Sequence, residues 1–175
     1  HTYHIHPNFQ NIINQYTTQV DKKLRIIFNA YADLDPAQKK AVQDAYSSNT
    51  NIENICNASV SPVKYNQLPA PMRAPLKSLY DNLWGENKVL GYFHVVANCG
   101  TVKSHFNDFR RVNQNSVCPF CGLEGLECEH DDGRDDYDHY LPKSLYPFIS
   151  VYFMNLCPMC HKCNSKSKGQ KDAPF

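Results

Sequence analysis

Apolar side chains recur at three- and four-residue steps in the first part of the chain. The stripe consists of Ile12, Ile13, Tyr16, Val20, Leu24, Ile27, Phe28, Tyr31 and Leu34. This spacing places the side chains on one face of a helix, which predicts a helix buried on that side. Asp35-Pro36 then predicts a helix end and a new start, because proline suits the first position of a helix. We expect the second helix over residues 36–47.

A connecting stretch follows, marked by Ser61-Pro62, Pro69, Pro71 and Pro75. Five later residues resume the helical spacing: Leu76, Leu79, Tyr80, Leu83 and Trp84. A further helix is expected over about 101–112, whereas the segment 89–96 is apolar and rich in residues typical of strands and receives no assignment. We interpret the aromatic residues between positions 8 and 112 as packing.

The pattern changes from Ser116 onward, where the chain is rich in cysteine and turn residues and no segment holds a long apolar period. Such a stretch builds little core by itself and needs a covalent or metal crosslink. We therefore expect a helical region over residues 1–115 and a small module over residues 116–175. The predicted fold class is α+β and mostly α.

Charge is distributed unevenly behind a formal net charge of +1. Residues 1–117 carry 12 Lys/Arg and 8 Asp/Glu, residues 122–138 carry 8 acidic groups and one Arg, and residues 139–175 carry five Lys and one Asp. The total gives no support for a nucleic-acid binder, which usually shows a basic surface, but a basic tail follows an acidic loop. Because the sequence lacks a long apolar run and a signal-like start, we predict neither a membrane span nor secretion.

Four of the eight cysteines form two Cys-x-x-Cys pairs, Cys118/Cys121 and Cys160/Cys163. Two cysteines at this spacing on a tight turn aim both sulfurs at one point, which suits a metal better than a disulfide. Gly122 follows the first pair and permits the sharp turn. Four thiolates would close the coordination sphere of a structural Zn²⁺, and they predict a reducing, cytoplasmic compartment.

Other cysteines leave alternatives open. Cys157-x-x-Cys160 overlaps the second pair, so Cys157 could serve as a ligand in place of Cys163. The run from Cys128 to Asp132 looks like a set of metal ligands, but we interpret it as part of a polar insertion. Cys56 and Cys99 are expected to be buried free thiols.

The residues between the two pairs carry the chemistry. They include Asp138-His139-Tyr-Leu-Pro142-Lys143-Ser and Asn155-Leu156, and the second pair leads into Asn164-Ser-Lys166-Ser-Lys168-Gly. In this order the pattern resembles the HNH endonuclease family, which has the ββα-metal fold. The resemblance covers residues 118–169 and none of the chain before them. The run from Asp138 to Ser144 also resembles stand-alone bacterial anti-phage nucleases of the Septu kind.

The resemblance implies that His139 is the general base and that Asp138 and Asn164 hold a catalytic Mg²⁺ or Mn²⁺. An imidazole with a pKa near about 6.5 can accept a proton from water at neutral pH, and carboxylate and amide oxygens suit a hard cation. Asn155 would pin the loop between the two strands and orient His139. The third family position is often His, so Asn164 makes one metal ligand weaker and leaves the metal preference open.

Each of these residues also has a structural interpretation. His139 could be a structural histidine or a zinc ligand, Asn155 a turn residue, and Asn164 a helix cap. Four lysines of the module either contact phosphates or form a solvated face: Lys143, Lys162, Lys166 and Lys168.

The implied function is metal-dependent hydrolysis of phosphodiester bonds in double-stranded DNA, in anti-phage defence or restriction. The helical region would dock DNA or a partner such as an ATPase. The acidic segment 124–138 would repel phosphates and restrain activity until a partner or substrate moves it. Two alternatives are a non-catalytic zinc module that binds DNA or protein, and a secreted disulfide protein. The target sequence, the choice between DNA and RNA, the partner and the oligomeric state stay open.

Overall fold

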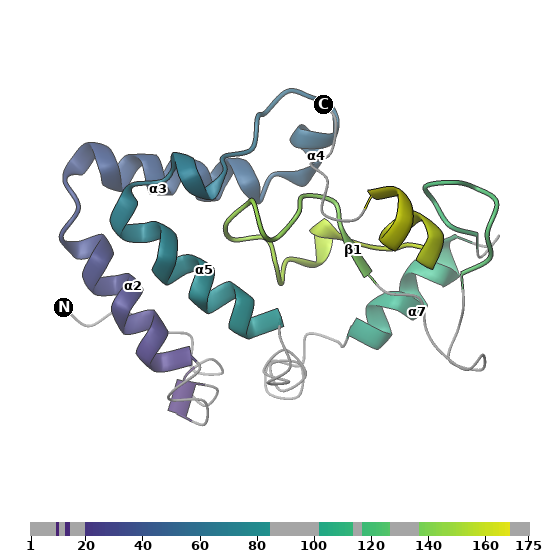
Figure 1. The fold of residues 1–175 in the computed structure, drawn as a ribbon, viewed down its shortest axis with the longest axis horizontal. Helices are drawn as coiled ribbons and strands as arrows, with labels where there is room; N and C mark the ends of the chain where they lie inside the picture. The colour runs from purple at the N-terminus through teal and green to yellow at the C-terminus, as the bar shows by residue number, and fades with distance from the viewer. Residues whose placement is uncertain are drawn as a thin grey trace.

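The computed structural model describes residues 10, 13–14, 20–84, 102–113, 117–126 and 137–168. Within them the fold is α+β and mostly helical, as the sequence predicts (Figure 1). The elements are α2 (Lys22–Ala32), α3 (Pro36–Asn49), α4 (Ile52–Cys56), η2 (Tyr65–Gln67), α5 (Ala70–Trp84), α7 (Val102–Val112), β1 (Tyr137–His139), η3 (Phe153–Asn155), β2 (Leu156–Pro158) and the π-helical segment η4 (Lys162–Lys168).

The start of α3 has the local chemistry that Asp35-Pro36 predicts. The Asp35 side chain accepts a hydrogen bond of 2.8 Å from the Gln38 backbone N–H, and the Gln38 side chain accepts one of 3.2 Å from the Asp35 N–H. This reciprocal pair satisfies two backbone donors that a helix start otherwise leaves unpaired. The sequence did not predict α4, whose N-cap Asn51 accepts from the Asn54 N–H.

Helix α5 corrects one expectation, because it begins at Ala70 rather than at Leu76. Pro71 lies in the first turn, where its missing N–H costs nothing, whereas Pro75 lies inside the helix and removes one hydrogen bond. Met72 is 1% exposed and extends the buried face formed by the later leucines. Burying a side chain of this size contributes about 2 kcal/mol, which outweighs one net hydrogen bond of about 1 kcal/mol.

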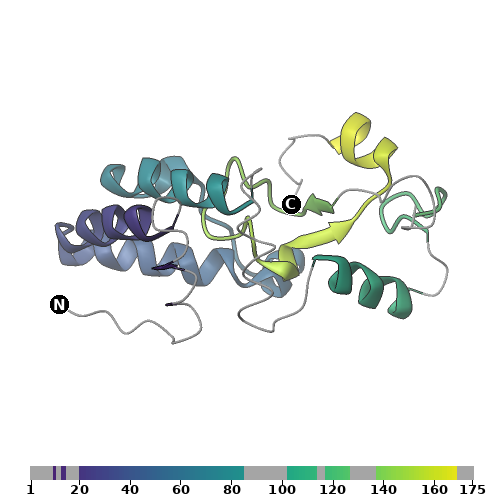
Figure 2. The same ribbon diagram turned by 90° about the horizontal axis from the view of Figure 1, so that it is seen from below.

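The N-terminal helices form one end of the molecule. Helices α2 and α5 lie side by side in both views, and α3 packs across them (Figures 1 and 2). The core beneath them is an apolar cluster of Leu34, Val42, Ala45, Leu68, Met72 and Leu76. Helix α7 and η4 lie at the other end, beyond the strands.

The two strands form an antiparallel pair with a defined register. Asp138 lies opposite Cys157, and His139 lies opposite Leu156. Because successive side chains of a strand point to opposite faces, Asp138 and His139 project to different sides of the pair. The side chains of Phe106 on α7 and Trp84 on α5 pack on the face that carries Tyr137 and Leu156.

The segment that connects the strands, residues 140–155, is buried against the helical region. Leu141 and Ile149 are 0% exposed and form a cluster with Ile52 and Ile55 of α4. The adjacent Phe148 packs edge-on against Tyr46 and against Tyr80, with ring centroids 5.5 and 6.1 Å apart. The connection therefore forms part of the core.

Two buried asparagines hold this connection in place. Asn155 accepts a hydrogen bond of 2.8 Å from the Leu141 N–H and donates to the carbonyls of Leu141 and Ile149. Asn49 of α3 donates to the carbonyl of Pro147 at 3.1 Å. Both asparagines are 0% exposed, so losing either would leave buried backbone groups unpaired, at about 1–3 kcal/mol per group.

Two sequence predictions fall on residues that the structure does not describe. These are the boundary between residues 115 and 116 and the apolar segment 89–96. None of the described helices has the length and apolarity needed to cross a membrane.

Candidate metal centre and active-site pocket

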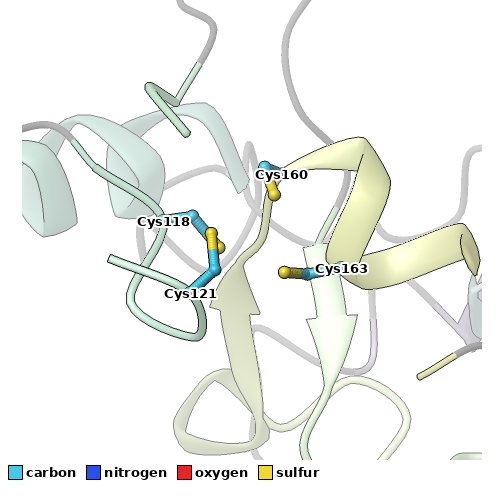
Figure 3. Close-up of side chains that lie close together, drawn as sticks. All are labelled: Cys118, Cys121, Cys160 and Cys163. Atoms are coloured by element: carbon cyan, nitrogen blue, oxygen red, sulfur yellow. The ribbon is translucent and has the colours of Figure 1, made fainter. Parts of the chain in front are cut away.

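Four cysteine sulfurs come together between the loop at 117–126 and the start of η4. The Sγ atoms of Cys118, Cys121, Cys160 and Cys163 lie within 4.8 Å of one another. Figure 3 shows the first pair on the loop, Cys160 directly after β2, and Cys163 on the helical segment, with the sulfurs turned toward a common space. These are the four cysteines that the paired spacing singled out.

Backbone hydrogen bonds and the conformation of Gly122 determine the shape of the loop at 117–126. The Cys118 N–H donates to the Glu124 carbonyl and the Gly122 N–H donates to the Cys118 carbonyl, both at 2.8 Å. Gly122 has a φ of 63°, a conformation that costs glycine little and other residues more. The turn at Gly122 therefore brings the sulfurs of the first pair together.

The four-thiol group fits a zinc ion. Tetrahedral zinc with Zn–S bonds of about 2.3 Å holds sulfurs about 3.8 Å apart, so a small contraction of the group suffices. Backbone hydrogen bonds from Glu124 and Leu123 lower the pKa of the Cys121 thiol to about 7, whereas loss of solvent raises the pKa of Cys163 to about 12. Four neighbouring thiolates need a cation to balance their charge, so this group could hold a metal ion.

The remaining described cysteines stand apart from this group. Cys157 projects from β2 opposite Asp138, and burial raises the pKa of its thiol to about 11. Cys56 was expected to be buried and is exposed. All cysteines that the structure describes are free thiols, so none of them supports a disulfide framework. Cys99 and the run from Cys128 to Asp132 lie outside the described residues.

A second site lies beside the metal centre, in a pocket of about 160 Å³. Three residues predicted to act in catalysis line it together: Asp138, His139 and Asn164. The first two come from β1 and the third from η4, so the strand pair and the helical segment meet at this pocket. Its other lining residues are Tyr137, Pro142, Lys143 and Ser144.

His139 is held as a neutral imidazole with a defined proton position. Its Nε2 lies 2.9 Å from the carbonyl oxygen of Ser150, and because a carbonyl only accepts, Nε2 carries the hydrogen. The ring is 8% exposed. Burial lowers the pKa of His139 to about 4, the Ser150 carbonyl opposes this shift, and the ammonium groups of Lys143 and Lys168 add to it. The neutral ring therefore keeps Nδ1 as a proton acceptor.

Asp138 is paired with an ammonium group. Lys168 Nζ contacts the Asp138 carboxylate, the carbonyl of His139 and, at 3.2 Å, the carbonyl of Tyr140. Both side chains are largely buried, at 15% exposed for the lysine and 6% for the aspartate. Burial raises the pKa of Asp138, and the hydrogen bond and charge of Lys168 oppose that rise. Three oxygen atoms thus converge on one cation.

The other predicted phosphate-binding lysines occupy different positions. Lys143 lines the pocket, with its ammonium 5.5 Å from the ring centroid of Trp84. Lys162 is exposed and lies 3.8 Å from the carboxylate of Glu124, and Lys166 is exposed on η4. Asn164 lies inside η4 rather than at its first residue, which disfavours the helix-cap interpretation.

The sequence predicted one contributor to the pocket's surroundings, Asn155, and missed two others, Ser150 and Trp84. Asn155 does not line the pocket, but its side chain ties the connection that follows His139. The carbonyl of Ser150 accepts the hydrogen bond from His139 Nε2–H, and Trp84 packs against the His139 ring. No local motif marks Ser150 or Trp84, because each contact depends on how the chain folds back.

Two known proteins are similar to part of this chain. Protein ea31 of Escherichia phage lambda is 33% identical over 99 residues, which is 56% of this chain and 27% of that protein. Septu protein PtuB of Bacillus thuringiensis is 38% identical over 61 residues, which is 34% of this chain and 21% of that protein. This chain therefore spans about a quarter of the length of these relatives. No family model and no solved structure matches it.

Proposed function

We propose that this chain is a metal-dependent endonuclease of the HNH type that hydrolyses phosphodiester bonds in DNA. The observation that carries the proposal is the single pocket lined by Asp138, His139 and Asn164. It brings together one residue with an imidazole, one with a carboxylate and one with an amide, which would supply a base and two oxygen ligands. A zinc module that only binds would need the four cysteines but not these residues.

His139 is the general base of the proposed reaction. With Nε2–H donating to Ser150, Nδ1 takes the proton from the attacking water. A base works best when its pKa lies near the working pH, and the pKa of the buried ring is about 4. An anionic phosphate in the pocket would favour the imidazolium form and raise this pKa toward the working range.

Asp138 and Asn164 would hold a divalent cation, Mg²⁺ or Mn²⁺, whose charge when bound stabilises the phosphate and the leaving oxygen. Lys143 also lines the pocket and would contact the phosphate backbone without reading its sequence. We expect products with 5′-phosphate and 3′-hydroxyl ends. A single module would nick one strand, so a double-strand break would need a dimer or a partner.

The similarity to Septu protein PtuB supports a role in anti-phage defence. In this role the substrate would be double-stranded DNA, and an ATPase or another defence protein would be the partner. The four-cysteine centre would hold Zn²⁺ and fasten the loop of Cys118 and Cys121 to the base of η4.

The test is a plasmid-nicking assay with Mg²⁺ or Mn²⁺ that compares wild type, His139→Ala and His161→Ala. Removing a general base typically lowers the rate by about 10²- to 10⁴-fold, and we expect this for His139→Ala with zinc content and fold retained. His161 is exposed and does not line the pocket, so His161→Ala should cleave as wild type does.

Equal cleavage by wild type and His139→Ala would contradict the assignment of the base. A wild type that holds zinc and binds DNA, but cleaves neither single- nor double-stranded DNA nor RNA with either metal, would favour the non-catalytic zinc module.

A further inference from the structure

Helix α5 ends directly beside the His139 ring. Its last residue is Trp84, and the ring centroids of Trp84 and His139 lie 4.5 Å apart with an interplanar angle of 75°. This edge-on arrangement is the one that aromatic pairs favour. Trp84 itself is held by packing against the cluster of Phe106, Tyr137 and Leu156, so it presents a fixed surface to the imidazole.

Helix α5 also contacts Ser150, whose carbonyl accepts the hydrogen bond from His139. The Ser150 hydroxyl donates to the carbonyl of Tyr80 at 3.3 Å, and the Ser150 carbonyl accepts from His139 Nε2. Tyr80 and Trp84 are four residues apart and therefore lie on one face of α5. That face thus contacts the imidazole directly through Trp84 and indirectly through Ser150.

The hydrogen bond to Ser150 and the packing of Trp84 together restrict the orientation of the imidazole more than either contact alone. The hydrogen bond to Ser150 fixes the position of Nε2 but leaves the ring plane able to turn about that bond. A large side chain packed on the ring removes much of this remaining freedom. Lys143 of the pocket also has its ammonium 5.5 Å from the Trp84 ring centroid, so Trp84 lies against two pocket residues.

We propose that Trp84 is a positioning residue for the base His139, so that helix α5 contributes to the reaction as well as to the core. This inference rests on the proposed nuclease function, because it assigns the imidazole a task that needs orientation. It extends the functional site into the helical region, which the motif resemblance does not cover.

The kinetic test compares Trp84→Leu, Trp84→Phe and Leu83→Ala in the whole 175-residue chain. Trp84→Leu keeps an apolar group but loses the aromatic contact, and small misplacements of a reacting group cost up to about 100-fold in rate. We expect kcat to fall about 10- to 100-fold with KM for DNA changed less than about 3-fold. Trp84→Phe should recover most of kcat.

Leu83→Ala is the matched control for lost packing. Leu83 is the neighbouring residue of α5, is 8% exposed and packs in a cluster with Ile13, Val20 and Leu79 that does not include His139. It should lower the melting temperature while leaving kcat close to that of wild type. A similar loss of kcat in Leu83→Ala and Trp84→Leu would reduce Trp84 to a packing residue and overturn the proposal.

A second readout does not depend on cleavage. Imidazole ¹H–¹⁵N spectra, with the His139 signals assigned by their loss in His139→Gln, report the tautomer and ring environment. Wild type should show the Nε2–H form, and Trp84→Leu should keep this tautomer while shifting and broadening the His139 ring signals, because the ring can then turn about the bond to Ser150. Trp84 is the single tryptophan of the chain, so its emission should change in His139→Gln.

The cleavage kinetics and the imidazole spectra together distinguish failure of the nuclease function from failure of the positioning role of Trp84. If wild type cleaves no nucleic acid, the nuclease function fails, and the imidazole spectra still decide whether Trp84 holds the ring. Unchanged His139 signals in Trp84→Leu, together with a wild-type kcat where cleavage is measured, would overturn the positioning role.

Discussion

The four-cysteine centre and the pocket around Asp138 meet at η4, which carries both Cys163 and Asn164, yet they differ in chemistry. The centre presents four sulfurs within 4.8 Å of one another and, among the residues that the structure describes, no other ligand type. The pocket is lined by residues of mixed chemistry, among them Asp138, His139 and Asn164. A closed set of thiolates suits a metal that holds chains together, whereas mixed ligands with space suit a site that receives substrate. Under the proposed function, these neighbouring sites would divide structure and reaction between them.

The largest effect should come from the cysteine centre. Cys163→Ser should abolish binding of one metal ion and lower the free energy of unfolding by about 5 kcal/mol or more, because metal binding energy is folding energy in such modules. Metal content and chemical unfolding measure this, and a strong chelator should reproduce it in wild type. Cys157→Ser is the control, since Cys157 lies outside the group. Metal loss in Cys157→Ser but not in Cys163→Ser would instead indicate the alternative register.

The ion pair between Asp138 and Lys168 should give the next largest effect. Lys168→Met leaves the Asp138 carboxylate, 6% exposed, without its cation, and such a loss costs about 3 kcal/mol. Mg²⁺ or Mn²⁺ should restore part of this stability, because a divalent cation can replace the ammonium beside Asp138. Unfolding curves with and without metal measure it.

Two further variants serve as controls for the measurement on Lys168→Met. Lys166 is exposed on the same segment, so Lys166→Met should change stability by less than about 0.5 kcal/mol. The double variant Lys168→Met with Asp138→Asn should regain stability because the buried charge is gone. Equal stability of Lys168→Met and wild type would mean that this ion pair contributes nothing.

The smallest effect concerns pH and belongs to His139. Its folded pKa of about 4 lies below the ordinary value of 6.5, so the unfolded chain binds more protons between these values and stability falls as pH falls through this window. Wild type should therefore lose about 1 kcal/mol more than His139→Gln between pH 7.5 and pH 5.5. Wild type and His139→Gln have the same four cysteines, so any change in stability from cysteine titration is the same in both and drops out of the difference between them.

Chemical unfolding at the two pH values measures this difference. His161→Gln removes an exposed histidine and should keep the wild-type slope. If His139→Gln and wild type lose stability in parallel, the imidazole of His139 is not buried as a neutral group.

Local chemistry was sufficient to predict several features of this protein. The break at Asp35-Pro36 and helix α7 follow from capping, proline geometry and apolar period. The gathering of Cys118, Cys121, Cys160 and Cys163 follows from two paired spacings. The start of α5 was misplaced because the burial of Met72, which outweighs the proline signals, depends on neighbours distant in sequence.

The tertiary structure decided what surrounds the predicted residues. The order of Asp138, His139 and Asn164 indicates a site, but their common pocket requires η4 to fold back onto β1. The contacts of His139 with Ser150 and Trp84, and of Lys168 with Asp138, join segments far apart along the chain. Apart from the two cysteine pairs, whose matching spacing suits one shared metal ion, spacing and periodicity report only on neighbours within a few residues. Burial and long-range pairing, which set the tautomer, the pKa and the charge balance here, arise only when the whole chain packs.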